Sequence, residues 1–355
     1  MKYTILLNRA KSVLMGLVIL STFSACEKIF HEEEQYRKEI YIVSDNNNVF
    51  GQEFTFGEAI DGFLSIYAAG NISVDKDVKV LLERNEAILN EYNKRVNGTN
   101  YSAYSLELPE DAYSLPDGWE VTLTPENPYS LFPIRVNIND LLPDERYYIP
   151  VSIQSVSDYQ FSERKSDVLF RVFFKNDYAT TKTDTYYSMN GTILDLREYF
   201  GWGDCGTTDP TVVNATKLVT PISENSIRIL PATMNSRDRG VLNRSGIKVE
   251  VTQEIIQVDS LGDDGLPTGI TIPCYKVNLS PYMNSNSSVK IMEASDGIDQ
   301  NNPTKLPSYY NPKNNMFVLN YCYRMPDEKF AFDFFGNRVE ADKWHKVREE
   351  FVRLK

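Results

Sequence analysis

Histidine is almost missing from this sequence. Among 355 residues, only His31 and His345 are histidines. A serine–histidine–aspartate triad needs a histidine inside the folded domain, and a multi-histidine metal site needs several. Because His31 lies in a polar stretch near the N-terminus, we expect no histidine-based triad and no multi-histidine metal site.

Cysteine is also scarce, with four residues in the chain. Beyond Cys26, the remaining Cys205, Cys274 and Cys322 are far apart and form neither a zinc pattern nor a C-x-x-C pair. One disulfide with one buried thiol and three buried free thiols are both compatible with this odd set. The sequence leaves the disulfide state open.

Long apolar runs and catalytic signatures are lacking as well. After Leu20 no run approaches the roughly 18 apolar residues that a membrane-spanning helix needs. The chain has no G-x-S-x-G, no H-E-x-x-H and no glycine loop for phosphate. We therefore expect no catalytic residues, no metal and no cofactor, and we expect a protein that is not an enzyme.

Positive charge is in deficit. The chain has 37 Lys and Arg against 49 Asp and Glu, a formal net charge of −12. Such a chain repels nucleic acid and anionic surfaces. We expect no nucleic-acid partner, and neutral saccharides or another protein fit the charge better.

The N-terminus carries a secretory signal. A basic start, the apolar run 13–20 and the small pair Ser24-Ala25 predict a signal peptide over residues 1–25. Small residues directly before Cys26 resemble a bacterial lipobox, whose cysteine is acylated and becomes the first residue of the mature protein. An ordinary signal peptide with an incidental cysteine is the alternative.

A polar segment, residues 26–38, follows as a lipidated tether. Its acidic run Glu32–Glu34 resembles the signal after the lipid-bearing cysteine that directs lipoproteins of Bacteroidetes to the outer face of the outer membrane. The resemblance implies a lipid anchor in the outer membrane, with the chain facing the cell exterior.

Short alternating segments predict an all-β fold. Residues 39–43, 63–67 and 78–82 alternate apolar and polar side chains between turn residues, and one short helix is expected at 85–92. About seven strands over residues 39–176 are typical of an immunoglobulin-like β-sandwich.

This first domain resembles a known family over residues 38–176. The likeness rests on four ordered segments, which are 77–80, 89–93, 104–109 and 147–153. The family is an uncharacterised domain of Bacteroidetes surface lipoproteins encoded in polysaccharide-utilisation loci. The resemblance implies that the domain is a spacer, and it implies no chemistry.

Residues 177–184 are predicted to link this domain to a second one, residues 185–355. Some eight strands in the second domain predict an antiparallel β-barrel or sandwich. The segment 309–323 resembles a hairpin in C-terminal domains of the same lipoproteins, which implies a lipocalin-like barrel of unknown role. The end of the chain, 341–355, fits a helix or a closing strand, and the likeness favours the strand.

One aromatic patch suits saccharide binding. Pyranose rings stack on aromatic faces while Asp, Asn and Arg side chains bond the hydroxyls. The candidate glycan-binding residues are Asp195, Arg197, Tyr199, Phe200, Trp202 and Asp204. Alternatively, Phe200 and Trp202 plug the end of the barrel. We expect Trp119, Trp344 and the segment 308–311 to pack within the fold.

These observations predict a non-catalytic outer-membrane surface lipoprotein of a polysaccharide-utilisation system. It binds a polysaccharide or oligosaccharide, or assists an uptake complex made of an outer-membrane transporter and its lipoprotein partner. A fimbria-like adhesive subunit is the alternative, for which Arg37-Lys38 offers a cleavage site ahead of the first strand. A cryptic endo-glycosidase is the third possibility, since the many acids supply carboxylate pairs.

Overall fold

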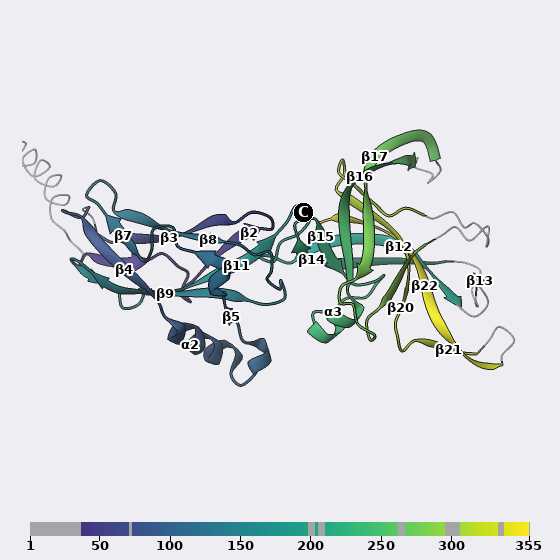
Figure 1. Cartoon of the computed structure of the whole chain (residues 1–355), viewed down its shortest axis with the longest axis horizontal. Helices are drawn as coiled ribbons and strands as arrows, with labels where there is room; N and C mark the ends of the chain where they lie inside the picture. Colours follow the sequence, from purple (N-terminus) through teal and green to yellow (C-terminus); the bar gives the residue numbers. More distant parts are fainter. Residues whose placement is uncertain are drawn as a thin grey trace, which may run out of the picture. The chain divides into compact units, whose positions relative to one another are not determined.

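The computed structural model describes residues 37–70, 73–197, 203–204, 210–261, 267–294, 306–332 and 337–354. Cys26 and the tether as far as residue 36 lie outside this description. The described chain is almost entirely β-strand and divides into two compact units (Figure 1). The predicted all-β, two-domain fold is confirmed. No helix within the described ranges is long and apolar enough to cross a lipid bilayer.

Two sheets form the N-terminal part. One sheet has the order β10 (Gln160–Phe161), β1 (Glu39–Ile42), β3 (Ile60–Ala68), β8 (Tyr129–Val136) and β6 (Tyr113–Ser114). The other has the order β2 (Val49–Thr55), β11 (Asp167–Lys175), β9 (Tyr147–Val156), β4 (Val78–Arg84) and β7 (Glu120–Leu123), with β5 (Leu106–Glu107) beside β9. Two sheets of short strands are the architecture that the sequence predicted for this domain.

Alternation along the strands puts one face of each sheet into the core. In β1, Ile40 and Ile42 are buried, and in β4, Val78 and Val80 are buried while the residues between them are more exposed. Because successive side chains of a strand point to opposite faces, this pattern assigns the apolar set to the interior. The interior of this part also holds Phe132, which is fully buried in β8.

One helix, α2 (Glu86–Asn97), follows β4. The side chain of Asn85 caps it by accepting the backbone N–H of Ala87 at 3.2 Å, and Gly98 ends it with a φ of 56°. The helix extends beyond the predicted segment 85–92. The prediction stopped early because the following residues are mostly polar and do not continue the helical spacing of apolar side chains. Short 3₁₀ turns follow at Tyr101–Ala103 and Glu110–Ala112.

The C-terminal part is one antiparallel sheet that closes on itself. Its order is β13 (Gly203–Asp204), β12 (Thr185–Arg197), β14 (Thr211–Ser223), β15 (Ser226–Ile229), β16 (Ile247–Leu261), β17 (Pro267–Pro281), β19 (Tyr309–Asn311), β20 (Met316–Arg324), β22 (Arg338–Arg353) and β21 (Lys329–Phe332). β18 (Lys290–Glu293) pairs with β20, and a short helix, α3 (Arg239–Ser245), precedes β16. Because β12 pairs with both β14 and β22, the sheet forms the predicted barrel.

The last strand, β22, shows that the C-terminal segment is a strand and not a helix. Val347 and Phe351 point into the barrel, four residues apart, a spacing that also suits a helix. Glu349 lies between them and is fully buried, so it points inward with them. A charged residue at an inward position hides the alternation, which is why the sequence alone fits both structures.

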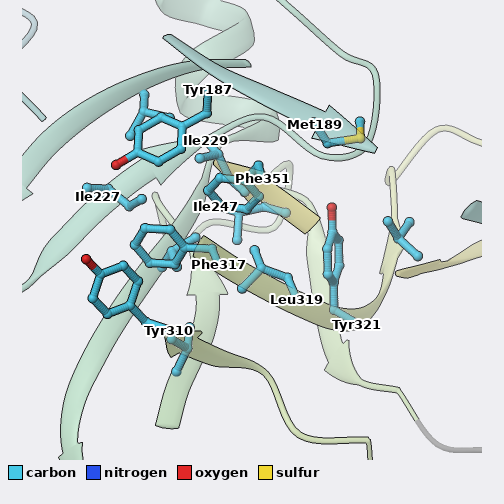
Figure 2. Packing of buried hydrophobic residues seen from close by; sticks show 14 of the residues in the cluster. Tyr187, Met189, Ile227, Ile229, Ile247, Tyr310, Phe317, Leu319, Tyr321 and Phe351 are labelled. Carbon is cyan, nitrogen blue, oxygen red and sulfur yellow. The ribbon is translucent and has the colours of Figure 1, made fainter. Parts of the chain in front are cut away.

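Aromatic rings fill the barrel. Phe317 and Phe351 stack with their centroids 5.0 Å apart, and Tyr187 meets Phe351 edge-on at 5.5 Å. Figure 2 shows these rings gathered with Tyr310, while Tyr321 stands apart from them. Small barrels can be filled by side chains in this way, so the described aromatic residues form a packed core.

The segment 177–184, predicted as a linker, begins with a hydrogen-bonded turn. The Asn176 side-chain oxygen accepts the backbone N–H groups of Tyr178 and Ala179 at 3.0 and 2.9 Å. Thr180 forms an isolated β-bridge with Lys175. Side-chain bonds of this kind fix a turn as backbone bonds do, so this start of the segment has a defined conformation.

Candidate functional site

Asp195 lies in a polar cluster at one end of the barrel. It is directly opposite His345 on β22, which in turn is opposite Tyr323 on β20. Asp195 Oδ1 is 2.8 Å from Nδ1 of His345, and Glu328 Oε2 is 3.0 Å from its Nε2. Lys343 Nζ approaches the same two carboxylates at 3.1 and 3.5 Å. Each of the two carboxylates therefore contacts both basic side chains.

Burial and charge shape this cluster. His345 is 7% exposed, and its ring stacks on Tyr323 with centroids 4.7 Å apart. Burial raises the pKa of Tyr323, and the carboxylates of Glu328 and Asp195 raise it further. Burial lowers the pKa of Lys343, but the hydrogen bond to Asp195 and the two negative charges outweigh it, so the pKa is raised. The cluster holds β12, β22 and the turn at Glu328 together.

The other predicted glycan-binding residues are placed only in part. β13 pairs with the end of β12, with Asp204 opposite Leu196 and Gly203 opposite Arg197. The backbones of Arg197 and Asp204 thus come together near Asp195, while their side chains are outside the description. Tyr199, Phe200 and Trp202 also lie outside the described residues. The sequence-based patch stays a prediction.

A slot on the C-terminal part combines polar and apolar side chains in its lining. Its volume is about 580 Å³. Pockets that hold small ligands span about 300–1,000 Å³, so the slot is large enough for a short oligosaccharide. Its lining consists of Glu254, Ile256, Lys276, Val277, Asn278, Leu279, Ile291, Met292, Glu293, Leu306, Pro307, Ser308 and Asn320.

The slot exists because two strands stop pairing. Within the described ranges, β17 pairs with β19 only through Tyr275 and Lys276, and β18 pairs only with β20. Consecutive residues of β17 and of β18 therefore line the slot, so backbone edges form its walls together with side chains. Backbone N–H and C=O groups at such edges are strong hydrogen-bonding groups.

Polar and apolar groups alternate around the slot. Lys276 Nζ and Glu254 Oε2 form an ion pair at 3.0 Å at its rim, and the Asn278 side chain is exposed. Ser308 and Asn320 bond each other and form a fixed polar wall. Ile291 and other aliphatic residues supply apolar surface. Hydroxyl groups and C–H faces of a sugar can both find partners on this surface.

The predictions that Trp119, Trp344 and the segment 308–311 pack within the fold are confirmed. Trp344 is buried, and Trp119 stacks on Phe132 with centroids 5.7 Å apart. Tyr310 and Asn311 are buried, as expected for the segment 308–311.

Neither a metal centre nor a reactive thiol emerges from the described residues. Within them, no group of three His, Cys, Asp or Glu side chains is placed to hold a metal ion. Cys274 and Cys322 are buried free thiols, and burial raises the pKa of Cys322 to about 11. A thiol with such a raised pKa is a poor nucleophile at neutral pH.

Comparison with known families agrees with this architecture. One family model, for an N-terminal domain, matches residues 36–160, and another, for a C-terminal domain, matches residues 166–351. The second match covers more than half of the chain. The chain belongs to this C-terminal domain family. The pairing of the two domains accounts for nearly all the residues that the structure describes. No curated protein matches the chain.

Solved structures share the fold at low sequence identity. A Bacteroides ovatus protein of unknown function is 13% identical, with 89% of this chain and 94% of that chain covered and a TM-score of 0.56. A multidomain protein from the same organism is 15% identical over 90% and 95%, with a TM-score of 0.52. An auxiliary nutrient binding protein from Bacteroides thetaiotaomicron is 12% identical over 86% and 91%, with a TM-score of 0.50. At these identities the likeness shows the fold alone.

Sequence reasoning missed the slot. Its polar residues lie on five separate segments, and Glu254 is 22 positions from Lys276 in the chain. No motif links them, because the slot depends on where strand pairing stops. The isolated Pro307 and Pro312 around β19 are a signal that could have indicated a break in the sheet, since proline cannot donate to a ladder.

Proposed function

We propose that this protein is a non-catalytic, lipid-anchored surface protein that binds glycan in a polysaccharide-utilisation system of a Bacteroidetes cell. The lipobox at Cys26 and the acidic run after it support the anchor and the outward orientation. A nutrient-binding protein with the same fold supports a role in uptake. The excess of negative charge favours neutral glycans over anionic ones.

The slot between β17 and β18 is the observation that carries this proposal. It combines a volume of about 580 Å³ with hydrogen-bonding groups and an aliphatic wall. The slot borders the packed core of the barrel, since Val277 belongs to the core cluster and also lines the slot. Lys276, Asn278 and Glu254 line or border the slot and contact saccharide hydroxyls in this proposal.

Binding at a membrane surface explains how a modest affinity suffices. Many anchored copies hold one polysaccharide at several points, and each further contact is intramolecular once the first has formed. The captured chain then stays near an outer-membrane transporter and its lipoprotein partner, which are the protein partners that we propose.

Retardation in affinity gels tests this function. The chain from residue 27 onward, which includes all described residues, is run through gels that contain neutral plant, fungal or host polysaccharides. We expect at least one neutral glycan to retard it and to be recovered uncleaved. Migration that no glycan changes, or release of reducing sugar, contradicts the proposal.

A further inference from the structure

A second pocket lies in the N-terminal part, in the domain for which the family resemblance implies a spacer role. It has a volume of about 360 Å³ and lies between α2, the turn before β2 and the start of β11. Its polar and aromatic lining consists of Asn47, Asn48, Glu91, Tyr92, Arg95 and Asp167. None of these residues belongs to the barrel domain or lines the slot.

Rigid elements form the walls of this pocket. Leu89 fixes α2 against the sheet by packing with Tyr148 and Leu169. The opposite wall is a tight turn, in which Asn48 has a φ of 58° and its side chain donates to the Arg164 carbonyl at 3.0 Å. The Asn48 carbonyl also accepts the backbone N–H of Leu169 at 2.8 Å. Such bonds hold the pocket in shape before any ligand arrives.

An aromatic ring borders the pocket on the helix side. Tyr92 is half-buried, and its hydroxyl lies 3.4 Å from that of Tyr148. Ile88, one turn earlier on α2, is half-buried and adds aliphatic surface next to it. The half-buried tyrosine ring and this aliphatic side chain together offer apolar surface against which the C–H groups of a pyranose pack.

Hydrogen-bond donors and acceptors surround this apolar surface. Asp167 is half-buried and accepts the Ser152 hydroxyl with Oδ1 at 2.6 Å. Glu91 and Arg95 are exposed four residues apart on the same helical face, and the Arg95 guanidinium lies 5.8 Å from the Tyr92 ring. Asn47 adds an exposed amide from the turn. Paired donors and acceptors of this kind bind the vicinal hydroxyls of a sugar.

Charge and size select among ligands. Two carboxylates, of Asp167 and Glu91, face one guanidinium, of Arg95, so the pocket is net negative and disfavours anions. The volume lies near the lower end of the range of about 300–1,000 Å³ for ligand pockets. We propose that this pocket is a second saccharide site, which binds a neutral monosaccharide or disaccharide unit independently of the barrel domain.

Saturation-transfer NMR on the full-length chain in detergent tests the proposal. The probes are glucose, galactose, mannose, xylose, cellobiose and maltose, with glucuronate as the anionic comparison. Asp167→Asn keeps an acceptor for Ser152, and Arg95→Gln lies on an exposed helix face, so both variants retain the fold. Lys94→Gln is the matched control, since Lys94 is an exposed neighbour on α2 that does not line the pocket.

We expect at least one neutral sugar to bind and each pocket variant to weaken it by about tenfold, as the loss of a hydrogen bond to a charged group does. All of these proteins carry the slot double substitution Lys276→Ala, Asn278→Ala as a common background, so that the slot does not contribute to the signal, and Lys94→Gln leaves the affinity in this background unchanged. Binding that persists in both pocket variants, a preference for glucuronate, or no binding by any neutral probe overturns the proposal. Loss of all binding in the slot background, before any pocket residue is changed, assigns the binding to the barrel domain and overturns this proposal while supporting the function proposed above.

Discussion

Lys217 and Glu349 form an ion pair inside the barrel, with Nζ and Oε2 2.7 Å apart. Neither side chain is more than 2% exposed. The Leu230 carbonyl accepts a further hydrogen bond from Lys217 at 2.6 Å, and the Tyr321 hydroxyl donates to Glu349 Oε1 at 2.9 Å. Burial lowers the pKa of Lys217 and raises that of Glu349, and the attraction between the two charges opposes both changes.

Breaking this pair destabilises the barrel strongly. Lys217→Met leaves Glu349 without its cation in a dry interior, and we expect the free energy of unfolding to fall by about 3–5 kcal/mol. Urea denaturation measures the difference. Lys248→Met, which breaks the half-exposed pair of Lys248 with Glu250, is the matched control, and its effect stays below about 1 kcal/mol. Equal stability of the two variants contradicts the structural account.

Alkaline pH unfolds the barrel through its buried tyrosines. Burial raises the pKa of Tyr187, Tyr321 and Tyr323 above the ordinary value of 10.0. The unfolded chain releases these protons above pH 10 and the folded chain keeps them. Stability is therefore complete below pH 10 and falls as the pH rises further, by about 1.4 kcal/mol per pH unit for each retained proton. Urea titrations at pH 9 and pH 11 measure this loss, and equal midpoints contradict it.

The two described thiols resist alkylation. Burial raises the pKa of Cys274, and it raises the pKa of Cys322 to about 11. At pH 8 few thiolates form, and both sulfurs lie under packed side chains. Peptide mapping after iodoacetamide treatment of the folded protein detects neither alkylated peptide, whereas treatment in urea detects both. Rapid labelling of Cys322 in the folded protein is the contrary result.

Trp202 tests the patch predicted from sequence. If its ring stacks on a sugar, Trp202→Ala weakens glycan binding by about five- to tenfold, in line with the energy of an aromatic stacking contact. Trp344→Phe is the control, because Trp344 packs inside the fold. Affinity gels with the retarding glycan compare the two variants. An unchanged affinity of Trp202→Ala contradicts the stacking contact.

The strand predictions rest on local alternation of apolar and polar residues. Where that alternation is hidden, the cause is physical. β1 and β4 alternate cleanly because water faces one side of each, whereas β22 hides its alternation because Glu349 points inward to meet Lys217. The polar end of α2 is held by the Asn93 side chain, which bonds the Ser105 backbone, and no sequence pattern shows such a partner.

Sites were harder to predict than strands because they depend on distant residues. Asp195 is a candidate glycan-binding residue because of its neighbours in sequence. Its hydrogen-bond partner His345, however, is 150 positions away. The scarcity of histidine does not show that the described histidine, His345, contacts two carboxylates. Both pockets likewise join elements that are far apart in the sequence, so only the fold brings their residues together.

The central claim is that the slot of the barrel domain binds a neutral glycan, and isothermal titration tests it most directly. The glycan that retards the protein most strongly is titrated into three proteins. These are the wild type, the slot double variant that carries both Lys276→Ala and Asn278→Ala, and Lys248→Ala as a control outside the slot. We predict a loss of about tenfold or more in affinity for the slot variant and none for the control. Equal affinities of all three proteins contradict the account.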